Sequence, residues 1–97
     1  MEITRLITSA KTIVRRNLSA NVVAASIEWH AVKGKLVLTY HMQNAHSEDD
    51  EEWCSLVLAE LEAEFPDIRL SALLMLPSTD LLCVANSGRH VVYQSHA

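Results

Sequence analysis

Apolar residues at the start of the chain recur at steps of three and four, which predicts an amphipathic helix over residues 2–18. Side chains three and four residues apart lie on the same side of an α-helix, so these positions form one apolar stripe. The stripe consists of Ile3, Leu6, Ile7, Ala10, Ile13, Val14 and Leu18. Basic and hydroxyl residues fall mostly outside it. We therefore expect this helix to pack through one face.

Residues 22–42 are typical of a β-hairpin with a two-residue turn at Lys33-Gly34, because glycine tolerates the positive φ that such turns need. If Val32 pairs with Lys35, side-chain alternation places the large apolar residues on one face. The pairs on that face are Ala31 with Leu36, Trp29 with Leu38, and Ile27 with Tyr40. The other face carries Glu28, His30, Lys35, Thr39 and His41, with Val32 and Val37 among them.

A second helix is predicted to begin near Ser47 and to end before Pro66. Serine is a favoured N-cap, and Ser47 to Asp50 resembles a capping box in which Asp replaces the usual Glu. The expected buried stripe is Cys54, Val57, Leu58, Leu61 and Phe65. Trp53 and Leu56 lie off the centre of this stripe, at its edge or exposed.

The remaining chain is mostly predicted strand, at Ile68–Leu76, Leu81–Ala85 and His90–Gln94, with turns at 77–80 and 87–88. The continuous apolar run at 72–76 suggests a strand that is covered on both faces. The expected fold is α+β, in the order α-β-β-α-β-β-β. It is an antiparallel sheet of four to five strands with two helices packed against it.

The composition indicates one globular domain over residues 1–97, since 49% of the residues are apolar and 21% are charged. The first residues lack the continuous apolar core of a signal peptide, and no stretch reaches the 18 or so apolar residues of a membrane span. We therefore expect a cytoplasmic protein that does not enter membranes. In that compartment the isolated Cys54 and Cys83 are expected to be reduced thiols in the core.

The net charge of −4 is unevenly distributed. Residues 48–67 contain only acidic charged side chains: Glu48, Asp49, Asp50, Glu51, Glu52, Glu60, Glu62, Glu64 and Asp67. An acidic surface repels phosphate backbones, so direct nucleic-acid binding is disfavoured. This asymmetry is the most informative electrostatic feature of the sequence.

No pattern in the sequence indicates catalysis. Phosphate-binding glycine loops, the G-x-S-x-G nucleophile turn and the H-E-x-x-H zinc helix do not occur in the chain. The five histidines do not have the i,i+2 or i,i+4 spacing of a local metal pair; they are His30, His41, His46, His90 and His96. We therefore expect no catalytic residue, no metal site, no cofactor and no enzymatic activity.

The acidic run before Trp53 has two interpretations. It is either a solvated helix start that the helix dipole stabilises, or a patch that meets a basic partner with Trp53 as an aromatic anchor. On the second interpretation the partner-binding residues are Glu48, Asp49, Asp50, Glu51, Glu52 and Trp53. Because they begin a helix, we expect Asp49, Asp50 and Glu52 to be exposed. The alternative recognition surface is the polar hairpin face of Glu28, His30, Thr39 and His41.

A small acidic α+β chain without a catalytic motif resembles the immunity proteins of bacterial toxin systems, of the contact-dependent growth inhibition or colicin type. Two segments carry the resemblance, Ser47-Glu48-Asp49-Asp50-Glu51-Glu52-Trp53 and Leu61-Glu62-Ala63-Glu64-Phe65-Pro66-Asp67-Ile68. The resemblance implies a cytoplasmic inhibitor that caps a basic toxin domain, commonly a nuclease, by mimicking the charge of its substrate.

Two other classes of function remain open. The chain can instead be a homo-oligomeric regulatory or assembly domain, such as a homodimer, that pairs through sheet edges or through the apolar strand Leu73–Leu76. It can also be a small enzyme or ligand-binding domain that uses Tyr40 and the histidines, in which case a deep pocket should contain two or more of them.

Overall fold

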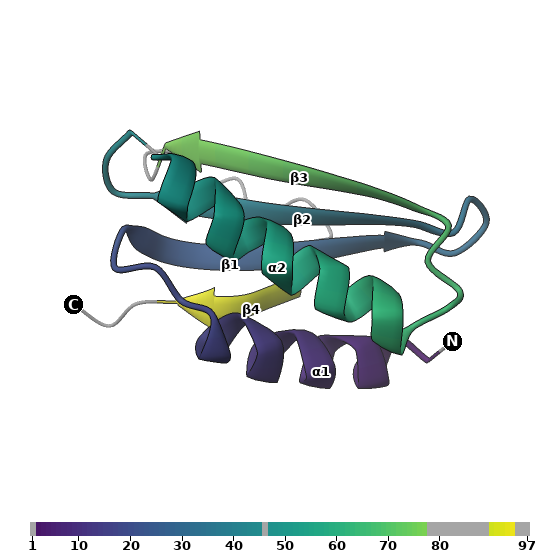
Figure 1. Ribbon diagram of the computed structural model, residues 1–97. Helices are drawn as coiled ribbons and strands as arrows, with labels where there is room; N and C mark the ends of the chain where they lie inside the picture. The colour runs from purple at the N-terminus through teal and green to yellow at the C-terminus, as the bar shows by residue number, and fades with distance from the viewer. Residues whose placement is uncertain (1, 46, 78–89, 95–97) are drawn as a thin grey trace.

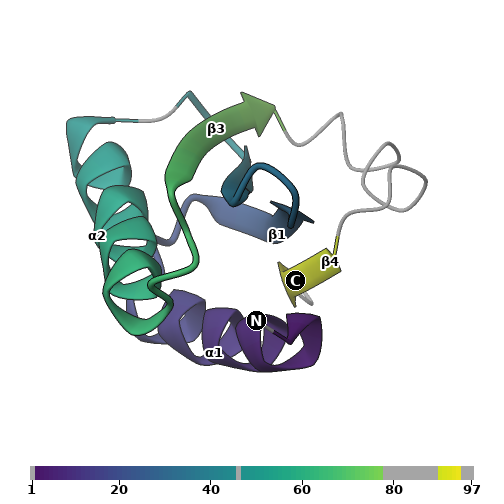
Figure 2. The same ribbon diagram turned by 90° about the vertical axis from the view of Figure 1, so that its right-hand side faces the viewer.

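The computed structural model describes residues 2–45, 47–77 and 90–94, and it has two helices and a four-stranded sheet. The elements are α1 (Ile3–Arg16), β1 (Val22–His30), β2 (Lys35–Met42), α2 (Glu48–Glu64), β3 (Leu70–Pro77) and β4 (His90–Gln94). Both helices lie on one face of the sheet, whose strand order is β3-β2-β1-β4 (Figures 1 and 2). The fold class α+β is therefore confirmed. Outside the described residues lie the predicted strand Leu81–Ala85, most of the predicted turn at 77–80, the turn at 87–88, His46, Cys83 and His96.

The sheet is mixed, so the prediction of a purely antiparallel sheet is wrong. β1 is antiparallel to both β2 and β4, but β2 and β3 are parallel. The cause is the length of α2, whose 17 residues span about 25 Å at 1.5 Å per residue. An eight-residue strand such as β3 is about as long, at roughly 3.3 Å per residue. α2 therefore returns the chain along the whole sheet, and β3 begins at the same end as β2.

The turn between β1 and β2 has four residues, Ala31 to Gly34, so the predicted two-residue turn is wrong. His30 pairs with Lys35, and Ile27 lies opposite Leu38, a shift of two residues from the predicted register. A shift of two leaves every side chain on its predicted face, because strand side chains alternate with a period of two. Ile27, Leu36, Leu38 and Tyr40 accordingly join one core under the helices.

Gly34, the last residue of this four-residue turn, also contacts the chain that leads into β3. It has a positive φ of 63°, and its carbonyl oxygen accepts hydrogen bonds from the backbone N–H groups of Arg69 (2.8 Å) and Leu70 (3.1 Å). A β-carbon at this position would lie 3.0 Å from the carbonyl oxygen of Asp67. The glycine thus serves both the conformation of the turn and the close approach of the chain that begins β3.

Burial along the strands is the reverse of what the apolar run suggested. β2 lies between β1 and β3, and its residues from Leu36 to Met42 are all buried. β3 lies at the edge of the sheet, and none of its residues is fully buried. Leu70 and Leu74 are 57% and 40% exposed. The prediction that the apolar run is covered on both faces is therefore wrong, because strand order and not hydrophobicity determines which strand is central.

The sheet face opposite the helices is less polar at its surface than predicted. Thr39 and His41 are buried in β2, as is Ser26 on β1, and they do not form an exposed polar surface. Glu28 is partly exposed, and its Oε1 lies 3.5 Å from Nε2 of the exposed His30. The alternative recognition surface of Glu28, His30, Thr39 and His41 is therefore reduced to its first two residues.

The core lies between the sheet and the apolar faces of both helices. Leu6, Ala10, Ile13 and Val14 of α1 are buried in it. α2 and its C-cap residue contribute Cys54, Val57, Leu61 and Phe65 to the core. The two predicted helix stripes are thus confirmed at their centres. Ile7 and Trp29 are partly buried and pack against this core. No helix among the described residues is long and apolar enough to cross a membrane.

Leu61 and Leu56 provide a matched test of this packing, since both lie on α2 but only Leu61 is fully buried, while Leu56 is 46% exposed. Leu61→Ala should lower the free energy of unfolding by about 2–5 kcal/mol, because it removes buried methyl groups and leaves a cavity. Leu56→Ala should change it by no more than about 0.5 kcal/mol. Urea unfolding followed by circular dichroism measures both values, and equal losses would contradict the described packing.

Candidate functional site

α2 begins with the capping box that the sequence predicted. The Ser47 hydroxyl accepts a hydrogen bond from the Asp50 backbone N–H at 3.3 Å, and the Asp50 carboxylate accepts one from the Ser47 N–H at 3.0 Å. This reciprocal pair satisfies two backbone donors that a helix start would otherwise leave open. The acidic side chains of the first turn also lie at the positive end of the helix dipole. The start of α2 is therefore well defined.

Asp50 is part of the fold and not of an exposed surface, which corrects the expectation for this residue. It is only 7% exposed. Besides Ser47, its carboxylate accepts hydrogen bonds from the Ser19 hydroxyl and from Asn21 Nδ2 (3.2 Å). The bond from Ser19, followed by the Ser47 backbone bond, holds the pKa of Asp50 below its usual value. Asp50 thus joins α2 to the segment before β1, and charge reversal here would disturb folding.

The other predicted partner-binding residues are exposed, as expected for Asp49 and Glu52. Glu48, Asp49, Glu51 and Glu52 surround the first turn and a half of α2, and Trp53 follows with 45% of its surface exposed. Helical spacing places Asp49 one turn before Trp53. The same spacing places Glu52 one turn before the exposed Leu56. Leu56 follows Trp53 by three residues, so these two side chains are neighbours on the helix surface. Trp53 and Leu56 therefore form an apolar pair bordered by carboxylates. Leu56 was missed as a candidate, although the sequence had already placed it off the buried stripe.

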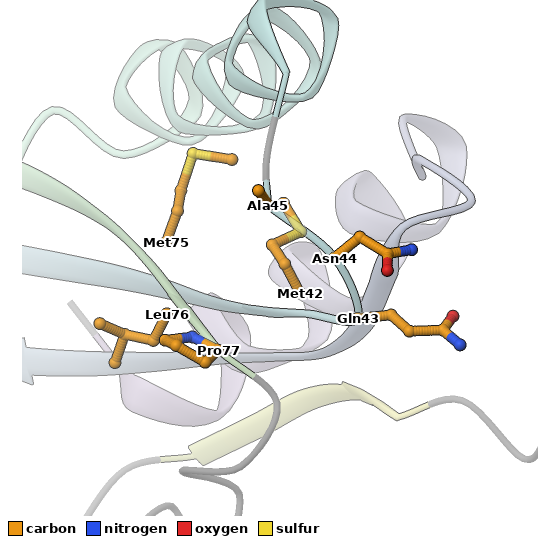
Figure 3. A pocket seen from close by; sticks show the side chains of 7 residues that line it. All are labelled: Met42, Gln43, Asn44, Ala45, Met75, Leu76 and Pro77. Atoms are coloured by element: carbon orange, nitrogen blue, oxygen red, sulfur yellow. The ribbon is translucent and has the colours of Figure 1, made fainter.

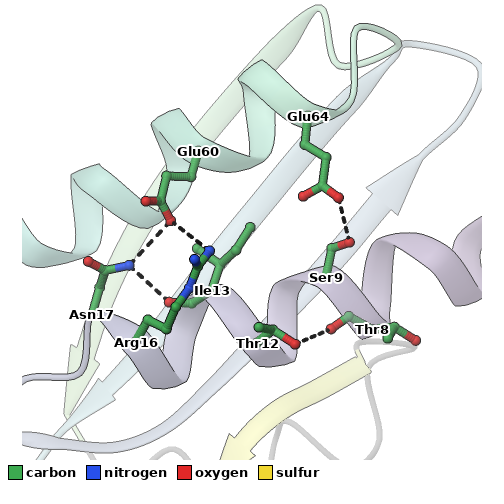
Figure 4. A network of polar contacts seen from close by, with 8 residues as sticks. All are labelled: Thr8, Ser9, Thr12, Ile13, Arg16, Asn17, Glu60 and Glu64. Atoms are coloured by element: carbon green, nitrogen blue, oxygen red, sulfur yellow. Dashed lines mark hydrogen bonds and ion pairs between the residues drawn. The ribbon is translucent and has the colours of Figure 1, made fainter.

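The second acidic group of α2 contacts the rest of the fold (Figure 4). Glu60 lies 3.7 Å from the Arg16 guanidinium and accepts a hydrogen bond of 3.3 Å from Asn17. Glu64 accepts a hydrogen bond of 3.0 Å from the Ser9 hydroxyl. On the other side of the helix, Glu62 accepts one of 2.5 Å from the Ser71 hydroxyl of β3. Glu60 and Glu64 therefore face α1, and Glu62 faces β3.

These contacts do not neutralise the helix. Of the residues that contact these carboxylates, only Arg16 carries a positive charge. Exposed ion pairs such as the one between Arg16 and Glu60 contribute about 0–1 kcal/mol to stability. The carboxylates of the last turn of α2 lie at the negative end of the helix dipole, and that turn contains no basic residue. Each unfavourable dipole interaction costs about 0.3–1 kcal/mol at a surface. The helix dipole therefore favours the acidic residues at the start of α2 but opposes those at its end, which contact α1 and β3.

Burial keeps two titratable groups of the core, Cys54 and Tyr40, in their protonated forms. Burial, with the charge of Asp50 second, raises the pKa of the Cys54 thiol to about 12, and burial also raises the pKa of the Tyr40 hydroxyl. Both groups are therefore protonated at neutral pH, and a protonated thiol is a poor nucleophile. The Tyr40 hydroxyl and both ring nitrogens of His41 are buried without a hydrogen-bond partner among the described residues. They lie on opposite faces of β2, since adjacent strand residues alternate.

Four hollows formed by described residues have no histidine in their walls, so these four do not support a ligand site built on Tyr40 and the histidines. One hollow of about 210 Å³ lies where β2 and β3 end, and its wall includes Met42, Met75 and Pro77 (Figure 3). Met75 and Leu76 project from opposite faces of β3 in this view, so the hollow wraps around the end of a strand. No group of three or more potential metal-ligating side chains occurs within residues 2–45, 47–77 and 90–94.

A second hollow, of about 300 Å³, lies between α2 and β3. Glu51 and Ser55 border it on the helix side, and Leu73 and Met75 border it on the strand side. We call it the α2–β3 groove. Its strand side is the helix-facing side of the edge strand, where Leu73 and Met75 are partly buried against the core.

Asp50 and Asp49 allow the structural role of the cap to be separated from its charge. Asp50→Asn should lower the free energy of unfolding by roughly 1–3 kcal/mol, because it weakens hydrogen bonds to a charged acceptor. Asp49→Asn, which alters only an exposed dipole interaction, should cost about 0.3–1 kcal/mol. Urea unfolding at neutral pH measures the difference, and equal costs would show that the cap contacts do not stabilise the fold.

The Asp50 effect should also depend on pH in a defined direction. A carboxyl group whose pKa is lowered by folding contributes stability above its unfolded pKa, near 3.8, and loses it as the pH falls through the folded value. The difference between the wild-type protein and Asp50→Asn should therefore be complete at neutral pH and shrink below pH 3.8. A difference that stayed constant in acid would contradict the lowered pKa.

No family model matches this chain, and no curated protein matches its sequence. The resemblance to immunity proteins accordingly rests on the acidic helix start, the segment that ends α2, and the acidic α+β character of the chain.

Proposed function

We propose that this chain is an inhibitor of the immunity-protein type, which neutralises a cognate bacterial toxin domain by covering a basic surface on it. The binding surface is the exposed start of α2, formed by Glu48, Asp49, Glu51, Glu52 and Trp53, with Leu56 beside them. Asp50 fixes the position of this surface through its hydrogen bonds to Ser19, Asn21 and Ser47, and it does not contact the partner. The chain acts by binding and needs neither catalysis nor a cofactor.

The observation that supports the proposal is that α2 has exposed carboxylates along its length and no basic residue. At the helix start the dipole favours such charges, but near the helix end it opposes them. The carboxylates near the helix end contact α1 and β3, so the acidic surface that we propose for binding is the helix start. An aromatic residue within the charged area adds the kind of anchor that dominates binding energy in many interfaces.

The chemistry of the partner follows from this charge. A nuclease binds phosphates, so the surface around its active site is basic. An acidic inhibitor is attracted to that surface over a distance, which accelerates association and excludes the substrate. A nuclease toxin domain is therefore the partner that we propose, and the localisation proposed with it is the cytoplasm of the cell that makes the toxin.

The first test is the association rate with the toxin domain recovered by a pull-down. Glu48→Lys, Asp49→Lys and Glu52→Lys together should slow association, because they reverse the field that attracts a basic partner. The rate for the wild-type protein should fall as the salt concentration rises past about 0.15 M, where the screening length is roughly 8 Å. Surface plasmon resonance at several salt concentrations measures both effects.

Glu2→Lys is the positional control for this test. It reverses one carboxylate, where the triple variant reverses three, at the start of the other helix, and Glu2 lies beside Glu64 and Phe65 at the far end of α2. It should leave the association rate nearly unchanged. If the triple variant folds normally by circular dichroism and associates as fast as the wild-type protein, α2 is only a solvated helix and the proposal fails.

Trp53→Ala tests the proposed anchor separately. Loss of a desolvated aromatic contact acts mainly on the dissociation rate, so this rate should rise by about tenfold or more while association changes little. Trp53→Phe should retain part of the contact and give an intermediate rate. A dissociation rate that is the same in all three proteins would place Trp53 outside the interface.

The second candidate is a homo-oligomeric regulatory or assembly domain. The edge position of β3 and the exposure of Leu70 and Leu74 favour it, because an apolar edge strand is a ready site for pairing with another chain. Light scattering on the purified chain decides between a monomer, as expected for the inhibitor, and a dimer.

A further inference from the structure

β3 has the features of a strand that accepts another strand. No described residue pairs with its outer edge. The strand is eight residues long and contains no charged residue, whereas exposed edge strands are commonly protected by charges or by an interior proline. Its proline, Pro77, stands at the end of the strand. The backbone N–H and C=O groups that point away from β2 are therefore suitably placed to pair with an added strand.

The two faces of this edge differ in chemistry. On the face away from the helices, Leu70, Ala72, Leu74 and Leu76 form an apolar row with two exposed leucines. On the helix side the edge borders the α2–β3 groove, where Glu51 lies near Met75, and Glu62 accepts a hydrogen bond from the Ser71 hydroxyl. A strand added here would have one face against an apolar row and the other under carboxylates.

Charge decides between the two occupants that could fill this edge. Antiparallel pairing of β3 with a second copy would place both α2 helices on the same face of the joined sheet. Neither helix contains Lys or Arg, so acidic residues would face acidic residues across the junction. A segment with basic side chains on its helix-facing side instead meets charges of opposite sign. The edge therefore fits a basic strand of another protein better than it fits itself.

We propose that the outer edge of β3 and the α2–β3 groove bind an extended segment of the partner, in which apolar and basic residues alternate. This inference rests on the proposed function and adds the mode of recognition to it. The segment extends the sheet as a further strand. Its apolar side chains continue the row of Leu70 and Leu74, and its Lys or Arg side chains reach the carboxylates of α2. Main-chain hydrogen bonds supply the affinity, and the alternation supplies the specificity.

The test uses a fluorescent twelve-residue peptide of alternating Val and Lys, with a peptide of alternating Val and Glu as the control. Fluorescence anisotropy should detect binding of the Val/Lys peptide to the full chain and none of the Val/Glu peptide. Hydrogen exchange followed by NMR should show slower exchange at alternate amides of β3 when the Val/Lys peptide is bound. Exchange in β4, at the opposite edge, should not change.

Two variants with matched exposure locate the binding edge. Leu74 on β3 and Val91 on β4 are 40% and 42% exposed, and they lie on the same face of the sheet at opposite edges. Leu74→Lys should weaken peptide binding by about tenfold or more, because it puts a charged side chain into the apolar row that the valine side chains of the peptide would cover. Val91→Lys should change binding by less than about twofold, since it lies far from the groove.

The outcomes separate this inference from the proposed function. If the Val/Lys peptide binds but the exchange of the β3 amides does not slow, strand addition is wrong while recognition by the acidic helix can still hold. If the chain alone is a dimer that protects the β3 amides, and Leu74→Lys dissociates it, the occupant is a second copy. If β3 is protected but reversing the charges at the start of α2 leaves partner binding unchanged, strand addition stands and the acidic interface fails.

Discussion

The arrangement of this protein depends on α2 packing along the full length of the sheet. The buried stripe of this helix, Cys54, Val57 and Leu61, packs in the core. Asp50 joins the start of the helix to the segment before β1. Because the helix is as long as a strand, β3 must enter parallel to β2 and lies at the sheet edge. The same packing positions the exposed acidic side of α2 beside that edge.

Two features of α2 and β3, one of charge and one of hydrophobicity, are unfavourable for the stability of a monomer. The carboxylates at the end of α2 oppose the helix dipole, and β3 exposes leucines where edge strands usually carry protective charges. Each feature alone is a small cost to stability. Together they form a surface with an acidic part and an apolar part, which a basic protein segment would complement on both counts.

Cys54 and Tyr40 are kept protonated by burial, and they belong to the core that supports α2. His41 is buried in the central strand with its ring nitrogens unpaired among the described residues. Cys54, Tyr40 and His41 are thus buried, and the exposed residues with a distinctive charge pattern are those at the start of α2.

Local pattern was enough to predict both helices, the capping box of Ser47 and Asp50, and the apolar face of the hairpin, because helix and strand periodicity directly determine which side chains share a face. It could not predict the four-residue turn, since a register shift of two keeps every face unchanged. Nor could it reveal that Asp50 is buried among Ser19 and Asn21, or that β3 lies at the edge while β2 is central. Those features depend on which distant segments meet, and only the packing of α2 across the sheet decided them.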